Sequence, residues 1–270
     1  MTEVRRTPEM SQLLVGVSDA PSELWVRGKA PDIPGVAIVG TRRCTEYGRS
    51  IARNLGHAVA TAGWPVISGL ARGIDAAAHL GTLDGGGAGF AVLGSGVDVI
   101  YPAENLTLAA RLVDNGGGII SEYPPGTPPA PFRFPARNRL IAGLSGVVIV
   151  IEAAVTGGAL ITARLALEQG KDVLAVPGDI TRATSEGCNL LIRDGAHPVL
   201  TSEDLIETLE RILGPSPRPP APRSVLADPS PLDEILENAD RPVGAVLADV
   251  VRAELAGLLQ IKDGVVTKPV

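Results

Sequence analysis

The sequence predicts an α/β fold: a Rossmann-like, mostly parallel, doubly wound sheet followed by a small C-terminal winged-helix-like module. From Val36 onwards, short apolar runs end at small or glycine-rich turns, and segments with helical periodicity follow them. The apolar runs are not interrupted by polar residues, which is typical of parallel strands buried on both faces. A proline-rich segment then separates a shorter, differently patterned C-terminal part.

Seven apolar runs supply the expected strands of the sheet. They are VAIV (36–39), PVIS (65–68), GFAVL (89–93), GGIIS (117–121), GVVIVI (146–151), DVLAV (172–176) and HPVLT (197–201). We expect helices over 45–62, from Ile74 onwards, and over 202–213, where Ser202 precedes an amphipathic pattern. The strand ends then lie along one edge of the sheet, where doubly wound folds bind ligands.

The chain divides into four segments. Residues 1–35 hold a strand-like LWVRG and too little else for an independent domain, so we expect this N-terminal extension to pack on the main domain, 36–213. Residues 214–231 are proline-rich and polar, which predicts a semi-extended linker. Residues 232–270 show three short helical patterns and an Asp263–Gly264 hairpin, the order of a small winged helix.

Composition excludes several classes of protein. The 270 residues are 45% hydrophobic with a net charge of −6, which describes a globular chain and excludes disorder throughout. Cys44 and Cys188 lie far apart without histidines at ligand spacing, so neither a disulfide scaffold nor a zinc site is expected. No window reaches the roughly 18 apolar residues of a membrane span. We therefore expect a cytoplasmic protein without membrane partner, metal or cofactor.

The first strand-turn-helix, VAIVGTRRCTEYG, predicts an anion site. A helix N-terminus beside Gly40 presents N–H groups to a negative ligand. Thr41 and Arg42 follow Gly40 directly, so the G-x-G-x-x-G fingerprint of NAD-binding proteins is not completed. Arg42 and Arg43 instead favour a phosphate group, the alternative being two solvated surface arginines.

The second turn, SGLARGIDAAAH, contains residue types used in catalysis. Gly69 and Gly73 permit close backbone approach, and Asp75 and His79 are four residues apart on one helix face. No nucleophile or metal ligand accompanies this pair, so we assign no catalysis to it. In the alternative interpretation, Asp75 orients Arg72 or caps backbone N–H groups.

A third segment predicts contact with nucleic acid. No acidic residue occurs between Glu122 and Glu152. Aromatic and basic residues alternate there: Phe132, Arg133, Phe134, Arg137 and Arg139. Arginines for phosphates and aromatic rings for bases are the chemistry of single-stranded nucleic-acid binding. In the alternative, Phe134 belongs to the core and the arginines pair with Glu122, Glu152 or other carboxylates.

A fourth turn, Thr156-Gly157-Gly158, again presents helix N–H groups to an anion, and Lys171 either points to the same edge or lies on a remote loop. Neither a G-x-x-x-x-G-K-[ST] P-loop nor a G-x-S-x-G nucleophile motif occurs. ATP hydrolysis and serine-hydrolase chemistry are therefore not expected.

Taken together, VAIVGTR, SGLARGIDAAAH, FPARNRLIAGLS, TGGALITARLALEQGKDVLAVPGD and SEGCNLLIRDGA resemble the DNA processing protein A (DprA/Smf) family over about residues 20–213. The resemblance implies a non-catalytic domain that binds single-stranded DNA and dimerises. It also implies protection of incoming DNA in natural transformation and help in loading the RecA recombinase. The stretch before Val36 is too short for the complete N-terminal helical, SAM-like domain of many members.

The resemblance also implies roles for residues. Gly40-Thr41-Arg42 would grip the DNA backbone, and Arg137-Asn138-Arg139 would line the same pocket behind the aromatic Phe134. With the turns above, the expected DNA-binding residues are Gly40, Thr41, Arg42, Gly69, Arg133, Phe134, Arg137, Asn138, Arg139, Gly157, Gly158 and Lys171.

Two other functions remain open. A nucleotide-processing enzyme, such as a phosphoribohydrolase on a Rossmann-like fold, also holds phosphate at glycine-rich turns, but its P-G-G-x-G-T turn is replaced here by Thr156-Gly157-Gly158-Ala159. A double-stranded DNA regulator would use the C-terminal module, whose VVRAELAGLLQIK stretch has few base-reading side chains. For a homodimer, the apolar stripe of helix 202–213 is a candidate surface, unless that stripe faces the sheet.

Overall fold

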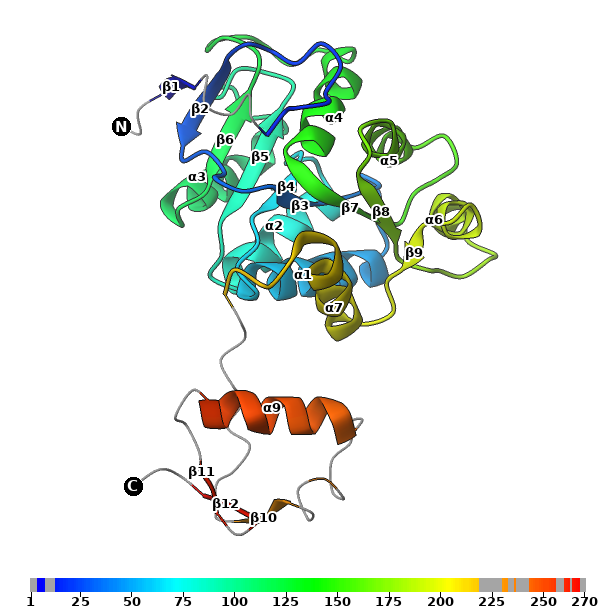
Figure 1. Ribbon diagram of the computed structural model, residues 1–270. Coiled ribbons are helices and arrows are strands. Elements are labelled where there is room, and N and C mark those ends of the chain that lie inside the picture. Colours follow the sequence, from blue (N-terminus) through cyan, green and yellow to red (C-terminus); the bar gives the residue numbers. More distant parts are fainter. Residues whose placement is uncertain are drawn as a thin grey trace. The chain divides into compact units, whose positions relative to one another are not determined.

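The computed structural model describes residues 4–7, 13–218, 230–232, 236, 243–255, 260–262 and 264–267. The chain forms two compact units, residues 1–218 and residues 219–270. Figure 1 labels the helices and strands of both units.

The first unit is built on one sheet, which has nine strands among the described residues, in the order β1-β2-β6-β5-β4-β3-β7-β8-β9. The strands are β1 (Val4–Thr7), β2 (Leu24–Gly28), β3 (Gly35–Gly40), β4 (Val66–Ser68), β5 (Gly89–Leu93), β6 (Gly118–Ser121), β7 (Ser145–Ile151), β8 (Asp172–Ala175) and β9 (His197–Pro198). Neighbouring strands from β6 to β9 pair in parallel, whereas β2 pairs antiparallel with β6 and β1 antiparallel with β2. The order reverses between β3 and β7, so the carboxyl ends of these two strands border the crevice where such sheets bind ligands.

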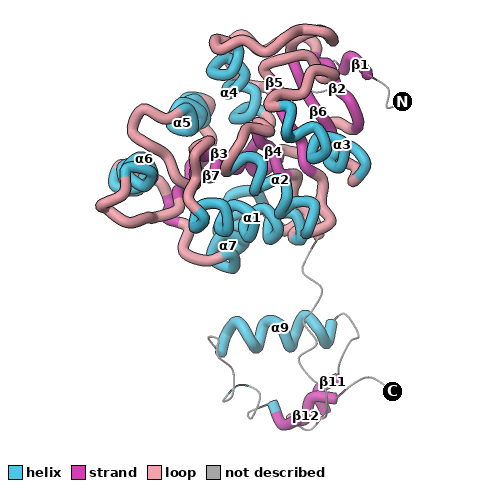
Figure 2. The backbone as a smooth tube through the Cα atoms, turned by 180° about the vertical axis from the view of Figure 1, so that it is seen from behind, coloured by secondary structure: helices cyan, strands magenta, loops and turns pink. Residues whose placement is uncertain are grey.

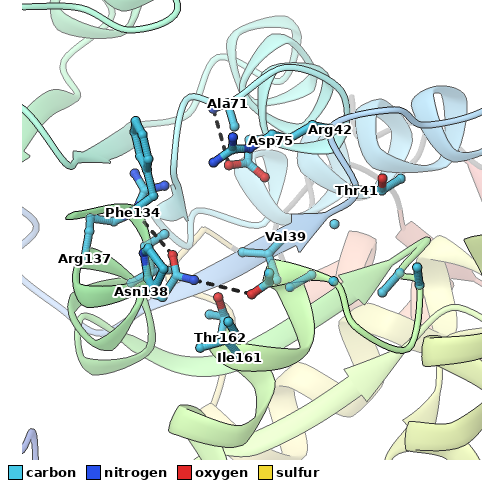
Figure 3. Close-up of a pocket in the computed structure, with 18 of the residues that line it drawn as sticks. Val39, Thr41, Arg42, Ala71, Asp75, Phe134, Arg137, Asn138, Ile161 and Thr162 are labelled. Carbon is cyan, nitrogen blue, oxygen red and sulfur yellow. Dashed lines mark hydrogen bonds between the residues drawn. The ribbon is translucent and has the colours of Figure 1, made fainter. Parts of the chain in front are cut away.

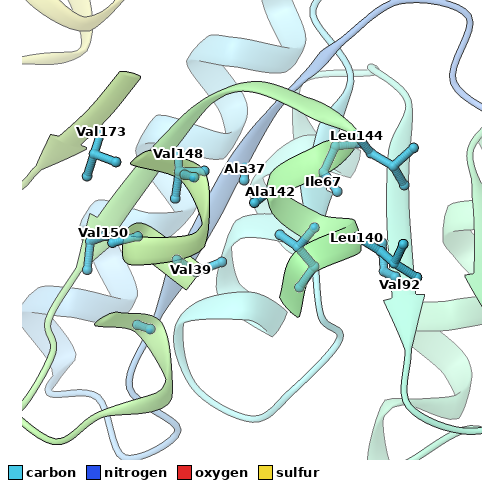
Figure 4. Packing of buried hydrophobic residues seen from close by; sticks show 14 of the residues in the cluster. Ala37, Val39, Ile67, Val92, Leu140, Ala142, Leu144, Val148, Val150 and Val173 are labelled. Atoms are coloured by element: carbon cyan, nitrogen blue, oxygen red, sulfur yellow. The ribbon is translucent and has the colours of Figure 1, made fainter. Parts of the chain in front are cut away.

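Helices cover both faces of this sheet (Figure 2). They are α1 (Glu46–Thr61), α2 (Ile74–Asp84), α3 (Leu106–Asp114) behind the 3-10 turn η2 (Ala103–Asn105), α4 (Arg133–Gly143), α5 (Gly158–Glu168), α6 (Ala183–Arg193) and α7 (Ser202–Leu213). Strand β7 shows the doubly wound arrangement directly. Val148 and Val150 pack in the cluster under α4 and α5 (Figure 4), whereas Val147 and Ile149 pack in the cluster under α1 and α7. Alternate side chains of one strand thus enter two cores.

The predicted fold class is confirmed for this unit. Each of the seven apolar runs contains a strand of the sheet, and the predicted helices 45–62 and 202–213 match α1 and α7 closely. Helices α3, α4 and α6 were not predicted. In α4 the signal is weak because arginines and Pro135 take up much of its first two turns; proline is tolerated there because an early helical N–H has no intrahelical partner.

The N-terminal segment joins the sheet rather than standing apart. Strand β2 extends the sheet beyond β6, and β1 lies outside β2. Leu14 and Val17 are buried in the cluster that includes α4. A side chain at Gly143 of α4 would collide with Val17, which shows how closely this segment packs.

The apolar stripe of α7 faces the sheet. Leu205 and Leu209 are fully buried, and Ile206, Ile212 and Leu213 pack partly buried against the same cluster. The hypothesis that this stripe is a self-association surface is therefore wrong, because the sheet already covers it.

The second unit contains α9 (Val243–Leu255) and a three-stranded sheet in the order β10-β12-β11. These strands are β10 (Ser230–Pro231), β11 (Gln260–Lys262) and β12 (Val265–Thr267). The predicted hairpin turn contains Gly264 at φ +77°, a conformation that favours glycine. Most of the helical patterns expected within 232–242 lie outside the described residues. None of the described helices is long and apolar enough to cross a membrane.

Candidate functional site

A pocket of about 570 Å³ opens at the carboxyl ends of β3 and β7, where the strand order reverses (Figure 3). Five segments line it: the turn after β3, the start of α2 with the loop before it, the loop after β5, helix α4 with the residues before it, and the turn from β7 into α5. Predicted site residues among the lining are Gly40, Thr41, Arg42, Phe134, Arg137, Asn138, Gly157 and Gly158. Gly69 lines a smaller adjoining pocket with Arg42, Phe134 and Arg137.

The turn after β3 depends on glycine at position 40. A side chain there would collide with the carbonyl oxygen of Ile151 and with Ile74, so only glycine allows β7 and α2 to approach this turn. Thr41 N donates to the carbonyl oxygen of Glu152 at 2.7 Å, which ties the turn to the end of β7. Arg42 is held at the pocket mouth as a result.

The N-terminus of α1 does not face the pocket with free N–H groups, contrary to the sequence prediction. The hydroxyl of the N-cap residue Thr45 accepts from Gly48 N at 3.2 Å, and the Glu152 carboxylate accepts from Thr45 N at 2.8 Å. Glu152 is only 4% exposed and adopts a left-handed φ of +48°. An internal carboxylate therefore occupies the place expected for an external anion. The sequence signal for Glu152 was its position directly after the β7 run.

The N-terminus of α5 is open instead. Its N-cap residue, Gly157, makes no side-chain capping bond, and both Gly157 and Gly158 line the pocket. A Cβ at Gly158 would meet no described atom within 4 Å. Gly157 N donates to Ala154 O at 2.8 Å and Leu160 N to Gly157 O at 3.1 Å, so the N–H groups left without an intrahelical acceptor are those of Gly158 and Ala159, two residues that line the pocket.

Arg42 and two aromatic rings form the mouth of the pocket. The Arg42 guanidinium lies 5.1 Å from the centroid of the Phe134 ring, and the Phe134 and Tyr101 centroids are 5.6 Å apart. Arg42 is exposed and makes no ion pair within the part of the chain that the structure describes. Phe134 is half-buried, so the interpretation that it belongs wholly to the core is wrong. No sequence signal marked Tyr101, which reaches the site from the long loop after β5.

Arg137 is part of the frame of the pocket. It is 4% exposed, and its guanidinium donates to the carbonyl oxygens of Gly69, at 3.0 Å, and of Val92. Burial lowers the pKa of Arg137 to about 10, against the opposing effect of the nearby Asp75 charge. A side chain at Gly69 would collide with this guanidinium, which accounts for glycine there. Arg137 thus joins the ends of β4 and β5 to α4.

Asp75 caps backbone N–H groups, as the alternative interpretation held. Its carboxylate accepts from Gly69 N at 3.1 Å and Ala71 N at 3.3 Å, and burial raises its pKa. Arg72 pairs with Glu104 rather than with Asp75. His79 is fully buried, neither ring nitrogen has a hydrogen-bond partner in the described structure, and burial lowers its pKa to about 3. The two residues therefore do not form an acid–base pair.

Three predicted residues lie outside the pocket. Arg139 forms a bidentate pair with Glu122, at 3.0 and 2.8 Å, as the alternative interpretation held. Arg133 donates to the Pro128 carbonyl oxygen and its guanidinium lies against the Tyr123 ring. Lys171 precedes β8 and so lies at the amino edge of the sheet, away from the carboxyl edge. The structure corrects the expectation that these side chains share one groove with Arg42.

Asn138 connects two walls of the pocket, since its side-chain amide donates to the Gly158 carbonyl oxygen at 3.3 Å. Within the described residues, no group of three or more His, Cys, Asp or Glu side chains could hold a metal ion. The pocket therefore offers an exposed guanidinium, an aromatic pair and open backbone N–H groups, which together suit a phosphate with an attached base.

Comparisons with known proteins agree with this arrangement. A family model described as DNA recombination-mediator protein A matches residues 3–210. The chain is similar to Protein Smf of Escherichia coli, with 38% identity over 273 residues, 93% of this chain and 72% of that protein. It is also similar to DNA processing protein DprA of Streptococcus pneumoniae, with 42% identity over 196 residues, 72% of this chain and 69% of that protein.

Two solved structures share the fold. One is DNA processing protein A from Streptococcus pneumoniae, with a TM-score of 0.70 and 38% identity, covering 76% of this chain and 74% of that chain. The other is DNA processing protein A from Helicobacter pylori, with a TM-score of 0.71 and 30% identity, covering 78% of this chain and 99% of that chain. The latter structure concerns that protein's single-stranded DNA binding mode.

Proposed function

The chain belongs to the DNA recombination-mediator protein A family, and from this premise we propose that it binds single-stranded DNA in the pocket between β3 and β7. The binding serves DNA processing in transformation and recombination. The observation that carries the proposal is the meeting of the exposed Arg42, the half-buried Phe134 and the open N-terminus of α5 around one pocket.

Each part of the pocket has a separate task. Arg42 and the N–H groups of Gly158 and Ala159 bind backbone phosphates, since a guanidinium and a helix N-terminus both favour negative charge. The ring of Phe134 stacks on a base, which any base satisfies because every base has a π-face. Arg137 and Asn138 hold α4 against β4, β5 and α5 and so fix the place of that ring. Binding is therefore selective for single strands and tolerant of sequence.

The hydrogen bonds of three serines near the strand ends support a role in binding rather than catalysis. The hydroxyls of Ser68, Ser95 and Ser121, which follow or end strands, each donate to a backbone carbonyl oxygen at 2.6–2.7 Å. They are held as buried structural groups instead of facing the pocket as nucleophiles. The competing function, a nucleotide-processing enzyme, predicts release of free base from nucleoside monophosphates, and we expect no such release.

We infer two partners beyond DNA: a second copy of the chain and a RecA-type recombinase. Two pockets on one dimer would hold the same strand at high effective concentration, which raises avidity without new contacts. The cytoplasm, where such a recombinase works, is the expected location.

A titration of the protein with single-stranded and duplex oligonucleotides at several salt concentrations tests the DNA-binding proposal. We expect preference for the single strand and a steep loss of affinity with salt, because phosphate contacts release counterions. Arg42→Ala removes one charge-assisted contact of roughly 1.5–3 kcal/mol, which corresponds to about 10- to 150-fold in affinity.

Arg53→Ala is the matched control, because it removes the same charge from an exposed side chain that pairs with Asp84 at the far end of α2. This control should bind like the wild type. Equal affinity for duplex, a flat salt dependence, or equal affinity of the Arg42 and Arg53 variants would contradict the proposal.

A further inference from the structure

Phe132 lies beside the pocket but does not line it, and its side chain is 71% exposed. We propose that Phe132, backed by the Arg133 guanidinium, is a second stacking platform that binds a base of the same single strand just outside the pocket. This inference rests on the proposed function and extends it from one bound nucleotide to a track of several.

Contacts with Arg133 hold the exposed Phe132 ring in place. The Arg133 guanidinium lies 5.4 Å from its centroid and 4.8 Å from the centroid of Tyr123, so one cation contacts both rings. Arg133 also donates through its side chain to Pro128 O, and its backbone N donates to Ala130 O at 3.0 Å. A ring already ordered in this way loses little conformational freedom when a base stacks on it.

The surrounding charge favours a polyanion. Residues 123–151 include no acidic residue, and Arg133 makes no ion pair within the described part of the chain. Two carboxylates border this segment, and both are engaged: that of Glu122 accepts from Arg139 at 3.0 and 2.8 Å, and that of Asp98 accepts from Gly126 N at 2.8 Å. A protein partner with an apolar anchor would gain from the ring alone, whereas a nucleotide gains from both the ring and the cation.

The platform continues the pocket. Pro131 and Phe134, the residues on either side of Phe132 and Arg133, both line the pocket. Positions two apart at a helix start lie within about 7 Å along the backbone but point in different directions. A strand whose base stacks on Phe134 therefore passes over the beginning of α4 and meets Phe132 with a following base.

The test compares the mononucleotide thymidine 5′-phosphate and an oligothymidylate of about 20 nucleotides on Phe132→Ala, Phe132→Trp and the wild type. We expect Phe132→Ala to bind the long strand about 5- to 150-fold more weakly, the range of one lost base stack, and the mononucleotide within twofold of wild type. Phe132→Trp should restore long-strand affinity, and its fluorescence should be quenched by the long strand beyond the change seen in the wild type.

Leu167→Ala controls for loss of an exposed apolar side chain, because Leu167 is 57% exposed near the end of α5 that faces away from the pocket. Phe132→Ala that binds the long strand like wild type, or a Trp variant whose fluorescence does not respond, overturns the second platform. Arg42→Ala with the same ligands separates this failure from that of the pocket itself. A normal Phe132→Ala with a weakened Arg42→Ala rejects only the platform, and two normal variants reject the proposed pocket as well.

Discussion

Phe134 and Arg139 belong to the same helix, but the structure gives them different partners. Phe134 faces the pocket with Arg42, while Arg139 is engaged with Glu122 in a pair whose side chains are mostly buried. The motif alone suggested that both residues contact DNA. Their partners leave only the first of them facing a pocket where a ligand can bind.

We therefore expect opposite effects of two substitutions in α4. Phe134→Ala should weaken single-strand binding by roughly 1–3 kcal/mol and leave the salt slope nearly unchanged, because stacking releases no counterions. Arg139→Ala should leave affinity per folded molecule near wild type but lower the free energy of unfolding by about 1–3 kcal/mol, because Glu122 loses its partner. Binding titrations and thermal melts of both variants measure these effects. A reduced salt slope in Arg139→Ala would show instead that the Arg139 side chain contacts DNA phosphates.

His79 gives the first unit a pH dependence of stability. Burial lowers its pKa to about 3 from an ordinary value of 6.5. Between these values the unfolded chain binds a proton that the folded chain does not, so stability is present above pH 6.5 and is lost as pH falls towards 3. The full effect of such a shift is on the order of 5 kcal/mol.

His79→Leu removes this titration. The difference in Tm between wild type and His79→Leu should be constant above pH 7 and should change in favour of the variant as pH falls from 6.5 to 4. The exposed His57 on α1 provides the control substitution, His57→Gln. If the Tm difference between wild type and His79→Leu stays constant down to pH 4, the low pKa assigned to His79 is contradicted.

Helices α1 and α2 approach each other through glycines. A side chain at Gly81 of α2 would collide with the carbonyl oxygen of Arg53, and one at Gly56 of α1 would collide with that of Ala78. This close packing supports the pocket, because α2 begins at Ile74, whose N–H donates to Thr41 O at 3.3 Å. The glycine turn and the helix crossing therefore depend on each other.

Gly81→Ala should lower the free energy of unfolding by about 1–3 kcal/mol, since the added methyl group cannot be accommodated without backbone movement. For a unit of this size each kcal/mol corresponds to roughly 2–4 °C in Tm. Gly158→Ala is the control, because a Cβ there meets no described atom within 4 Å. Equal melting temperatures of the two variants would show that the helices can separate at no cost.

We expect the complete molecule to bind one DNA strand through more than one pocket. A few cationic and stacking contacts hold a single strand weakly, whereas two linked pockets gain affinity through effective concentration. The α7 stripe is covered by the sheet and so does not form the dimer surface. Any self-association must use another surface.

We expect the purified protein to have the mass of a dimer in solution. It should also accelerate nucleation of a RecA-type recombinase on DNA coated with single-strand binding protein, without consuming nucleotide itself. Light scattering gives the mass, and recombinase filament assays with and without this protein give the nucleation rate. If the protein is a monomer and never accelerates nucleation, the proposed role in recombinase loading is wrong, whereas the proposed DNA-binding pocket is unaffected.

Local sequence patterns were enough to predict the strands of the sheet and the edge at which ligands bind. Apolar runs such as 89–93 and 146–151 matched strands because a strand buried on both faces must be continuously apolar. The glycine turns after β3 and β7 marked the carboxyl edge of the sheet, but the strand order, which places Gly40, Arg42 and Gly158 around one pocket at that edge, was not predicted.

Which polar groups remain available for a ligand depends on contacts that form when distant parts of the chain fold together. Arg42 and Arg139 look alike in the sequence, but long-range folding pairs Arg139 with Glu122 and leaves Arg42 without an ion pair among the described residues, its charge favouring the ionised form of the buried Asp75 carboxylate. The N-termini of α1 and α5 also look alike, but Glu152 fills the first and leaves the second open. Sequence periodicity reports which face of an element is buried, whereas the partner of a charged group depends on residues far away in the chain, which local patterns do not contain.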